Sequence, residues 1–307
     1  MKSVLSVSPH IHSGRSTAGV MRDVLIALSP AALAGVIIFG WRALLVLAVS
    51  LASAVGFEAL FNHLLKKPQT VGDLSAAVTG LLLGLNMPAN VPLWQVVFGA
   101  FFAIVVVKCL FGGLGCNLVN PAIAARVLMV VSFGSMALPC LPTVVDTVSS
   151  ATPLADGSTA VAPLRLFLGV YGGALGETCT LALLIGFVYL LARRVITWHI
   201  PVAFIGTTFL FCLCLGGFDF YESFGQIMAG GLMLGAIFMA TDYVTSPVTS
   251  VGRIIFGAGA AVITVLIRHF GSYPEGVSFA ILFMNIVTPY IDRLVKRRVF
   301  GKGGKTA

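Results

Sequence analysis

One apolar run follows another along almost the whole chain, and this repetition limits what the chain can fold into. A helix needs about 20 mostly apolar residues to cross the hydrocarbon core of a bilayer, and about ten such segments can be marked here. We therefore expect an all-α polytopic membrane protein. The expected spans are 23–40, 43–65, 74–87, 93–110, 118–138, 168–192, 200–217, 224–241, 253–268 and 277–295.

The composition agrees with a helical membrane protein. Hydrophobic residues make up 58% of the chain and charged residues only 10%, whereas a soluble domain carries about 25% charged residues. The runs are apolar on all sides, while the strands of a membrane barrel alternate in polarity over about ten residues. The 34 glycines suit helices that pack closely in lipid. A soluble domain and a barrel are both disfavoured.

The formal net charge of +8 could suggest a nucleic-acid ligand, but the distribution of the charge indicates a membrane topology instead. With ten spans and a cytoplasmic N-terminus, only Arg42, Arg165 and Arg268 fall outside, and Arg126 lies within a helix. This asymmetry follows the positive-inside rule. We expect a multi-pass protein of the cytoplasmic (inner) membrane of a bacterium or archaeon, with no cleaved signal peptide. The inside residues are Lys2, Arg15, Arg22, Lys66, Lys67, Lys108, Arg193, Arg194, Arg253 and the basic residues of 293–305.

A weak internal repeat indicates two related halves. "VVFGAFFAIVVVKCLFGG" from Val96 resembles "IIFGAGAAVITVLIRHFGS" from Ile254, and the segments before and after these stretches also match in order. The copies are five expected helices apart, so the second copy must enter the membrane upside down. Inverted repeats with broken helices hold ligands where the halves meet. The predicted organisation is a cytoplasmic segment 1–22, a five-helix repeat 23–138, an extracytoplasmic loop 139–167, a second repeat 168–295 and a basic cytoplasmic tail 296–307.

The polar stretch "DTVSSAT", which runs from Asp146 to Thr152, stands out in this apolar chain. Ser, Thr and Asp are ordinary residues of a solvated turn, which is the simplest interpretation. The stretch also resembles the D-x-x-(S/T)-(G/S)-A-T sequence at which a flavin transferase esterifies FMN phosphate to threonine. Its residues are Asp146, Ser149, Ser150, Ala151 and the acceptor Thr152. Ser150 stands where the strictest form of the motif has glycine.

Four longer motifs in the same order resemble the NqrB/RnfD family over nearly the whole chain. They are "PLWQVVFGA", "FGGLGCNLVNPAIAAR", "IFMATDYVTSPVTSVGR" and "SYPEGVSFAILFMNIVTPYIDR". The family occurs in the sodium-pumping NADH:quinone oxidoreductase and in the Rnf ferredoxin:NAD⁺ oxidoreductase. NqrB proteins usually carry an extra N-terminal segment, so the length favours the RnfD branch.

The resemblance implies a flavoprotein subunit of an ion-translocating oxidoreductase, with no catalytic residues of its own. Electron transfer would belong to bound flavin, positioned and tuned by the protein. FMN would be held covalently at Thr152 outside the cytoplasm. A second, non-covalent flavin, expected to be riboflavin, would lie near Gly112, Gly113, Asn117 and Asn120. The glycines could instead serve only helix packing or a turn, and the asparagines could be helix caps.

Two acids at the ends of apolar helices are candidates for cation coupling. An ionisable group in or near the hydrocarbon is costly and is therefore a functional candidate. The resemblance implies a role for Asp292 in cation uptake, and Asp242 lies in the broken-helix motif, where free carbonyls could help to bind Na⁺. The alternative is that Asp292 pairs with Arg293 or Lys296 at the membrane surface. Glu58, Glu177, Lys108, Arg126 and Arg268 could be structural.

Other functions stay open at this point. The six cysteines form no C-x-x-C pair, so a zinc or iron–sulfur site within the chain is unsupported, although a cluster shared with a partner is compatible with them. The favoured hypothesis is the redox-driven Na⁺ or H⁺ pump subunit, in contact with other Rnf proteins and membrane lipid. The alternatives are an NqrB-type, quinone-reducing subunit and a secondary transporter or urea-type channel.

Overall fold

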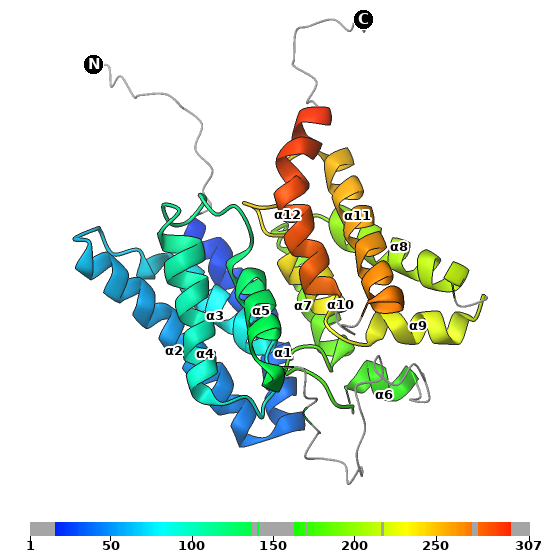
Figure 1. Ribbon diagram of the computed structural model, residues 1–307, viewed down its shortest axis with the longest axis horizontal. Helices are drawn as coiled ribbons and strands as arrows, with labels where there is room; N and C mark the ends of the chain where they lie inside the picture. Colours follow the sequence, from blue (N-terminus) through cyan, green and yellow to red (C-terminus); the bar gives the residue numbers. More distant parts are fainter. Residues whose placement is uncertain are drawn as a thin grey trace, which may run out of the picture.

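The computed structural model describes residues 16–136, 140, 163–169, 171–215, 218–271 and 276–295. Within these residues the chain is a bundle of helices (Figure 1). The first half contains α1 (Thr17–Phe39), α2 (Trp41–Leu64), η1 (Val71–Asp73), α3 (Ser75–Leu85), α4 (Leu93–Phe101), its π-helical continuation η2 (Phe102–Cys109), α5 (Pro121–Ser132) and η3 (Gly134–Met136).

After the short α6 (Pro163–Leu168) comes the second half. It contains α7 (Thr180–Ala192), α8 (His199–Leu215), α9 (Phe220–Met228), α10 (Leu232–Leu234), the π-helical η4 (Gly235–Met239), α11 (Ser250–Phe270) and α12 (Val277–Leu294).

Equivalent helices of the two halves run in opposite directions. The side on which α1 begins and α12 ends is here called the upper side, as it is drawn in Figure 1. A bond between Asp23 and Arg193 places the start of α1 beside the end of α7, so these first helices of each half are antiparallel. Likewise α4 runs toward the upper side and α5 away from it, whereas α11 runs away and α12 toward it. This arrangement suits the expected inverted halves.

Only some of the helices in the bundle are long and apolar enough to cross a membrane. Among the described residues, four helices are long and apolar enough to cross a membrane, namely α1, α2, α11 and α12. A fifth is obtained if α9 and the α10–η4 segment are counted as one span with a 65° bend. The all-α membrane fold is confirmed. The repeat of ten spans stays a prediction, because the other apolar helices have only 10–17 residues.

Two expected spans are interrupted in the structure. The helix predicted over 168–192 is present only in α7, because Gly169 adopts a left-handed φ of 91° and residues 171–179 are not helical. This non-helical segment lies against the end of α3, where the amides of Leu175 and Gly176 donate to the carbonyls of Met87 and Leu85. A Cβ on Gly176 would lie 2.7 Å from the Cβ of Leu85. The interruption therefore supplies partners for backbone groups that the end of α3 leaves free.

The helix predicted over 224–241 is broken between α9 and α10. Gly230 has a left-handed φ of 68° there. Arg268, at the end of α11, donates to the carbonyls of Gln226 and Ala229 at 2.6 and 3.1 Å, and the Tyr171 hydroxyl donates to the carbonyl of Met228. These side chains satisfy the carbonyls at the break, as a broken helix in lipid requires.

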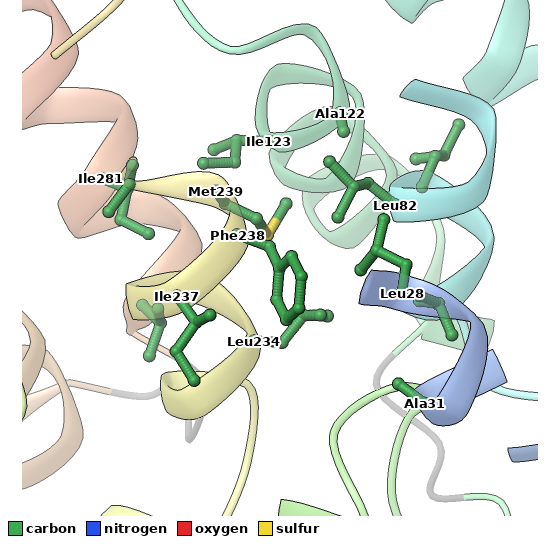
Figure 2. Packing of buried hydrophobic residues seen from close by; sticks show 14 of the residues in the cluster. Leu28, Ala31, Leu82, Ala122, Ile123, Leu234, Ile237, Phe238, Met239 and Ile281 are labelled. Carbon is green, nitrogen blue, oxygen red and sulfur yellow. The ribbon is translucent and has the colours of Figure 1, made fainter. Parts of the chain in front are cut away.

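The core joins both halves. Buried apolar side chains of α1, α3 and α5 contact those of α10, η4 and α12 in one cluster, and Figure 2 shows Phe238 and Met239 of η4 surrounded by Leu28, Leu82 and Ile123. At the seam between the halves, the position that a Cβ on Gly186 of α7 would take is blocked by the carbonyl oxygen of Ala27 in α1. Glycine is required here because the two helices approach so closely.

Candidate functional site

A cavity of about 100 Å³ lies between the two halves near the upper side. Residues of α1, α3, the end of η2 and the start of α5 line it from the first half. Residues around the ends of α7 and η4 line it from the second half. Its walls are largely apolar, and its polar side chains are Ser75, Thr79, Lys108, Asn117, Asn120, Thr241, Asp242 and Tyr243. The fold thus brings together three of the predicted site residues, Asn117, Asn120 and Asp242.

The most unusual feature of the cavity is a buried ion pair. The ammonium of Lys108 lies 2.8 Å from Oε1 of Glu58 in α2, and both side chains are 2% exposed. Lys108 also donates to Oγ of Ser75 at 2.6 Å, and Thr70 donates to Oε1 of Glu58 at 2.7 Å. Within the described part of the chain, Oε2 of Glu58 is buried without a hydrogen-bond partner. A charged pair this deeply buried is costly unless its geometry is favourable.

The glycine-rich loop after η2 positions Lys108 and Asn117 at the cavity. Gly112 and Gly113 have φ values of 118° and 94°, which disfavour residues with a Cβ. The amide of Gly113 donates to the carbonyl of Lys108 at 3.0 Å. The two glycines therefore form the tight turn that ends the π-helical segment. Oδ1 of Asn117 is buried and, among the described residues, has no hydrogen-bond partner, so it can accept a bond from a ligand in the cavity.

Asn120 has a structural role in addition to its place in the cavity wall. Its Oδ1 accepts from the amides of Ala122 and Ile123 and so caps α5, and its Nδ2 donates to the carbonyl of Met239 at 3.2 Å. Asn86, at the end of α3, also contacts Met239 through its sulfur at 3.5 Å. The ends of α3 and η4 and the start of α5 therefore meet in the interior, where ligands of inverted-repeat transporters are held.

The two candidate acids both bond to the segment between η4 and α11: Asp242 lies within this segment, and Asp292 reaches it from α12. Oδ2 of Asp242 accepts from the Thr245 hydroxyl at 3.1 Å, and Oδ1 of Asp292 accepts from the amide of Val248 at 3.1 Å. The Thr288 hydroxyl donates to the carbonyl of Thr245 and ties α12 to the same segment. Desolvation raises the pKa of Asp242 above its usual range, although the bond from Thr245 partly offsets this.

The expected ion-pair alternative for Asp292 is not seen in the described residues. The guanidinium of Arg293 lies over the ring of Tyr290 at 6.0 Å from its centroid, and Lys296 lies outside the described residues. The carboxylate of Asp292 instead bonds to a backbone amide.

The predicted covalent flavin site cannot be placed. Asp146, Ser149, Ser150, Ala151 and Thr152 all lie outside the described residues. The six cysteines all lie within the described residues and form no disulfide bond. In the part of the chain that the structure describes, His, Cys, Asp and Glu side chains form no cluster of three or more that could hold a metal ion.

The sequence analysis missed the partnership of Lys108 and Glu58. The available signal was the presence of two opposite charges inside apolar runs, which marks functional or paired groups. Their contact joins residues 50 positions apart, and no local pattern reveals such a pair.

Comparison with known proteins matches nearly the whole chain to one family. A family model described as "NQR2, RnfD, RnfE family" matches residues 4–301. The chain is 47% identical to the RnfD protein of the Na(+)-translocating ferredoxin:NAD(+) oxidoreductase complex of Acetobacterium woodii, covering 97% of this chain and 95% of that protein.

Two further relatives carry similar names. The RnfD protein of the proton-translocating ferredoxin:NAD(+) oxidoreductase complex of Clostridium ljungdahlii is 40% identical, over 97% of this chain and 96% of its own. The corresponding RnfD protein of the ion-translocating oxidoreductase complex of Escherichia fergusonii is 37% identical, over 97% and 98%.

Proposed function

Since the chain belongs to the NQR2, RnfD, RnfE family, we propose that it is the RnfD component of an ion-translocating ferredoxin:NAD⁺ oxidoreductase complex. The observation that carries this proposal is the match to the RnfD protein of Acetobacterium woodii at 47% identity over 97% of the chain. The protein is then a membrane component of an oxidoreductase and works together with the other proteins of that complex. The coupling ion is Na⁺ or H⁺, since the relatives named above differ in this respect.

The first proposed cofactor is FMN, esterified through its phosphate to Thr152. Support comes from the sequence "DTVSSAT", in which Asp146, Ser149, Ser150 and Ala151 precede the acceptor. When bound, flavin accepts and passes on electrons. The threonine's part is to hold the cofactor permanently at one place on the extracytoplasmic side.

The second proposed cofactor is a non-covalent flavin, such as riboflavin, in the cavity between the halves. The polar groups there fit the edge of a flavin: Lys108 is a donor, Asn117 Oδ1 is a buried acceptor without a partner among the described residues, and the walls are apolar. The ammonium of Lys108 would also balance negative charge that arrives with an electron. Asn120 would contribute indirectly, because it already caps α5.

The cavity between the halves is smaller than a site for a flavin must be. Pockets for ligands of drug size measure about 300–1,000 Å³, whereas this cavity measures about 100 Å³. Binding therefore requires the cavity to widen, and we propose that the loop with Gly112, Gly113 and Asn117 moves outward. Cys116 is exposed in that loop, so its rate of alkylation should change when riboflavin is added to the flavin-free protein. Cys214, which is also exposed but lies at the end of α8, serves as the control.

Cation coupling is proposed for Asp242 and Asp292. Around them lie the hydroxyls of Thr245 and Thr288 and the carbonyl oxygens of a segment without regular helix. Hard cations such as Na⁺ prefer oxygen ligands of this kind, and a carboxylate can alternatively carry a proton.

The proposed orientation places the upper side in the cytoplasm and the protein in the inner membrane. The start of α1, the ends of α2, α7 and α12 and the start of α11 lie toward the upper side (Figure 1), and the basic residues at or beside these ends are Arg22, Lys66, Lys67, Arg193, Arg194, Arg253 and Arg293. The elements or ends toward the lower side carry Arg42, Arg165 and Arg268. The excess of Lys and Arg marks the cytoplasmic side.

One purification tests the proposal as a whole. A tag on this chain should isolate a multi-subunit complex that reduces NAD⁺ with reduced ferredoxin, and the intact mass of the chain should include one FMN. The Thr152→Ala variant should lose that mass and keep the assembly, while Ser150→Ala should retain it. A tagged chain that brings down no redox-active partner would refute the proposed function. An FMN adduct that persists in Thr152→Ala would refute only the attachment site.

A further inference from the structure

A second, polar cleft of about 540 Å³ lies on the upper side between the start of α1 and the end of α7. Ser16, Gly19, Val20, Arg22 and Asp23 line it from α1, and Ala192, Arg193, Arg194 and Val195 line it from α7. Its volume falls within the range of about 300–1,000 Å³ that is usual for small-ligand sites. None of the residues proposed for flavin or cation binding lines this cleft.

The charges that line the cleft favour an anion. Three arginines face a single acid, Asp23. Asp23 is already engaged, because Arg193 Nε lies 3.3 Å from its Oδ2 and the Tyr189 hydroxyl donates to its Oδ1 at 3.2 Å. The described lining of the cleft therefore carries three positive side chains and one negative side chain, a formal charge of +2. The N-terminal end of α1, a helix of 23 residues, adds a positive end at the same place.

The backbone of Arg194 is held in a turn that glycine would also fit. Its φ is 53°, in the left-handed region, where the residue after a helix is usually glycine because a Cβ is disfavoured. The amides of Arg194 and Val195 donate to the carbonyls of Leu191 and Leu190 and fix this turn.

The position of the cleft at one end of a spanning helix suits the depth of lipid headgroups. It is formed by the first two turns of α1, one of the four spanning helices, and by the residues that follow α7. Trp198, which is 53% exposed, follows a few residues later in the chain, and exposed tryptophans mark the membrane–water interface. Basic pockets between transmembrane helices at this level suit phosphate-bearing headgroups.

We propose that this cleft binds the phosphate of an anionic phospholipid headgroup, held by Arg22, Arg193 and Arg194. Arg193 is fixed in place by Asp23, and the other two guanidiniums contact the phosphate from α1 and from the end of α7. The bound headgroup joins the first helix of one half to the first helix of the other half. It therefore stabilises the seam between the halves from the membrane surface.

The full chain, purified in detergent, can be tested by native mass spectrometry with added phosphatidylglycerol, phosphatidylcholine or inorganic phosphate. Phosphatidylglycerol should bind more tightly than phosphatidylcholine. Arg194→Gly should weaken its binding about fivefold, which corresponds to the usual contribution of one basic residue near a membrane surface. This variant suits the left-handed backbone and should fold normally. Arg22→Gln is a second variant with the same expected effect.

The chain contains a matched control. Lys66 follows α2 on the same side with a left-handed φ of 52°, and it does not line the cleft. Lys66→Gly makes the same change of charge and backbone, and it should leave phosphatidylglycerol binding unaltered. Equal losses in Lys66→Gly and Arg194→Gly would overturn the proposal, since binding would then reflect surface charge alone.

Three other results would also overturn it. One is binding of inorganic phosphate that depends on Arg194 while phosphatidylglycerol binding does not, which would indicate a soluble anion. Another is unchanged phosphatidylglycerol binding in both arginine variants. The third is loss of a partner protein from the complex in Arg194→Gly without loss of lipid, which would make the cleft a protein contact.

Discussion

Replacing Lys108 by methionine is expected to destabilise the protein through the charge that it leaves behind. The ammonium and the carboxylate of Glu58 lie 2.8 Å apart, and both side chains are 2% exposed. Removing one partner of such a buried pair costs about 3–5 kcal/mol, chiefly because the other charge stays buried and unpaired. Glu58 keeps the hydrogen bond from Thr70 at 2.7 Å, so we expect a loss near the lower end, about 3 kcal/mol.

Adding Glu58→Gln to Lys108→Met tests whether the unpaired charge of Glu58 causes the loss of stability. In Glu58→Gln/Lys108→Met the buried charge is gone, so about 2 kcal/mol of the loss should be recovered. Equilibrium unfolding of the full chain in mixed micelles, by titration with sodium dodecyl sulfate, measures all members of this double-mutant cycle. Lys66→Met, which alters an exposed lysine on the same side, should change the free energy of unfolding by less than about 0.5 kcal/mol.

Two outcomes would refute the argument. If Lys108→Met unfolds like the unmodified protein, the pair is not buried as described. If the double variant is no more stable than Lys108→Met, the cost comes from lost packing of the lysine chain and not from the unpaired carboxylate.

Three further predictions concern the ion path, the seam and the helix break. Asp292→Asn and Asp242→Asn should lower ion-stimulated turnover of the reconstituted complex and leave flavin content unchanged; normal pumping by both would place the ion path elsewhere. Gly186→Val should cost at least about 1–3 kcal/mol in the same unfolding assay, because its side chain meets the carbonyl of Ala27, whereas Gly206→Val, with open space around it, should be tolerated. Arg268→Met should cost about 1.5–3 kcal/mol, because two carbonyls at the end of α9 lose a charged donor; Arg42→Met is the exposed control, and an equal effect of both would contradict the role of Arg268.

The sequence predicts the long helices well and the broken ones poorly. α2, α11 and α12 agree with the expected spans to within three residues, and α1 begins six residues earlier than expected, because continuous apolar runs of that length favour one long helix. The segments 168–192 and 224–241 are equally apolar but interrupted. Their breaks depend on partners that are distant in sequence, such as Arg268 at Gln226 and Leu175 at Met87, and hydropathy carries no information about these contacts.

The residues of the candidate site were also predicted only in part. Asn117, Asn120 and Asp242 were selected from motifs, and the fold brings all three to one cavity. The cap formed by Asn120 follows from local sequence, since asparagine before a proline is typical of a helix start. Lys108 and Glu58 stood out only as charges in apolar surroundings, because their partnership arises from the packing of η2 against α2.

The contact of Gly186 with Ala27 has a mechanical consequence. Because the two backbones touch there without an intervening side chain, the halves cannot come closer at this point, and moving them apart would open a void in lipid. Relative motion of the halves at this contact is therefore limited to a rotation or to sliding of α7 along α1.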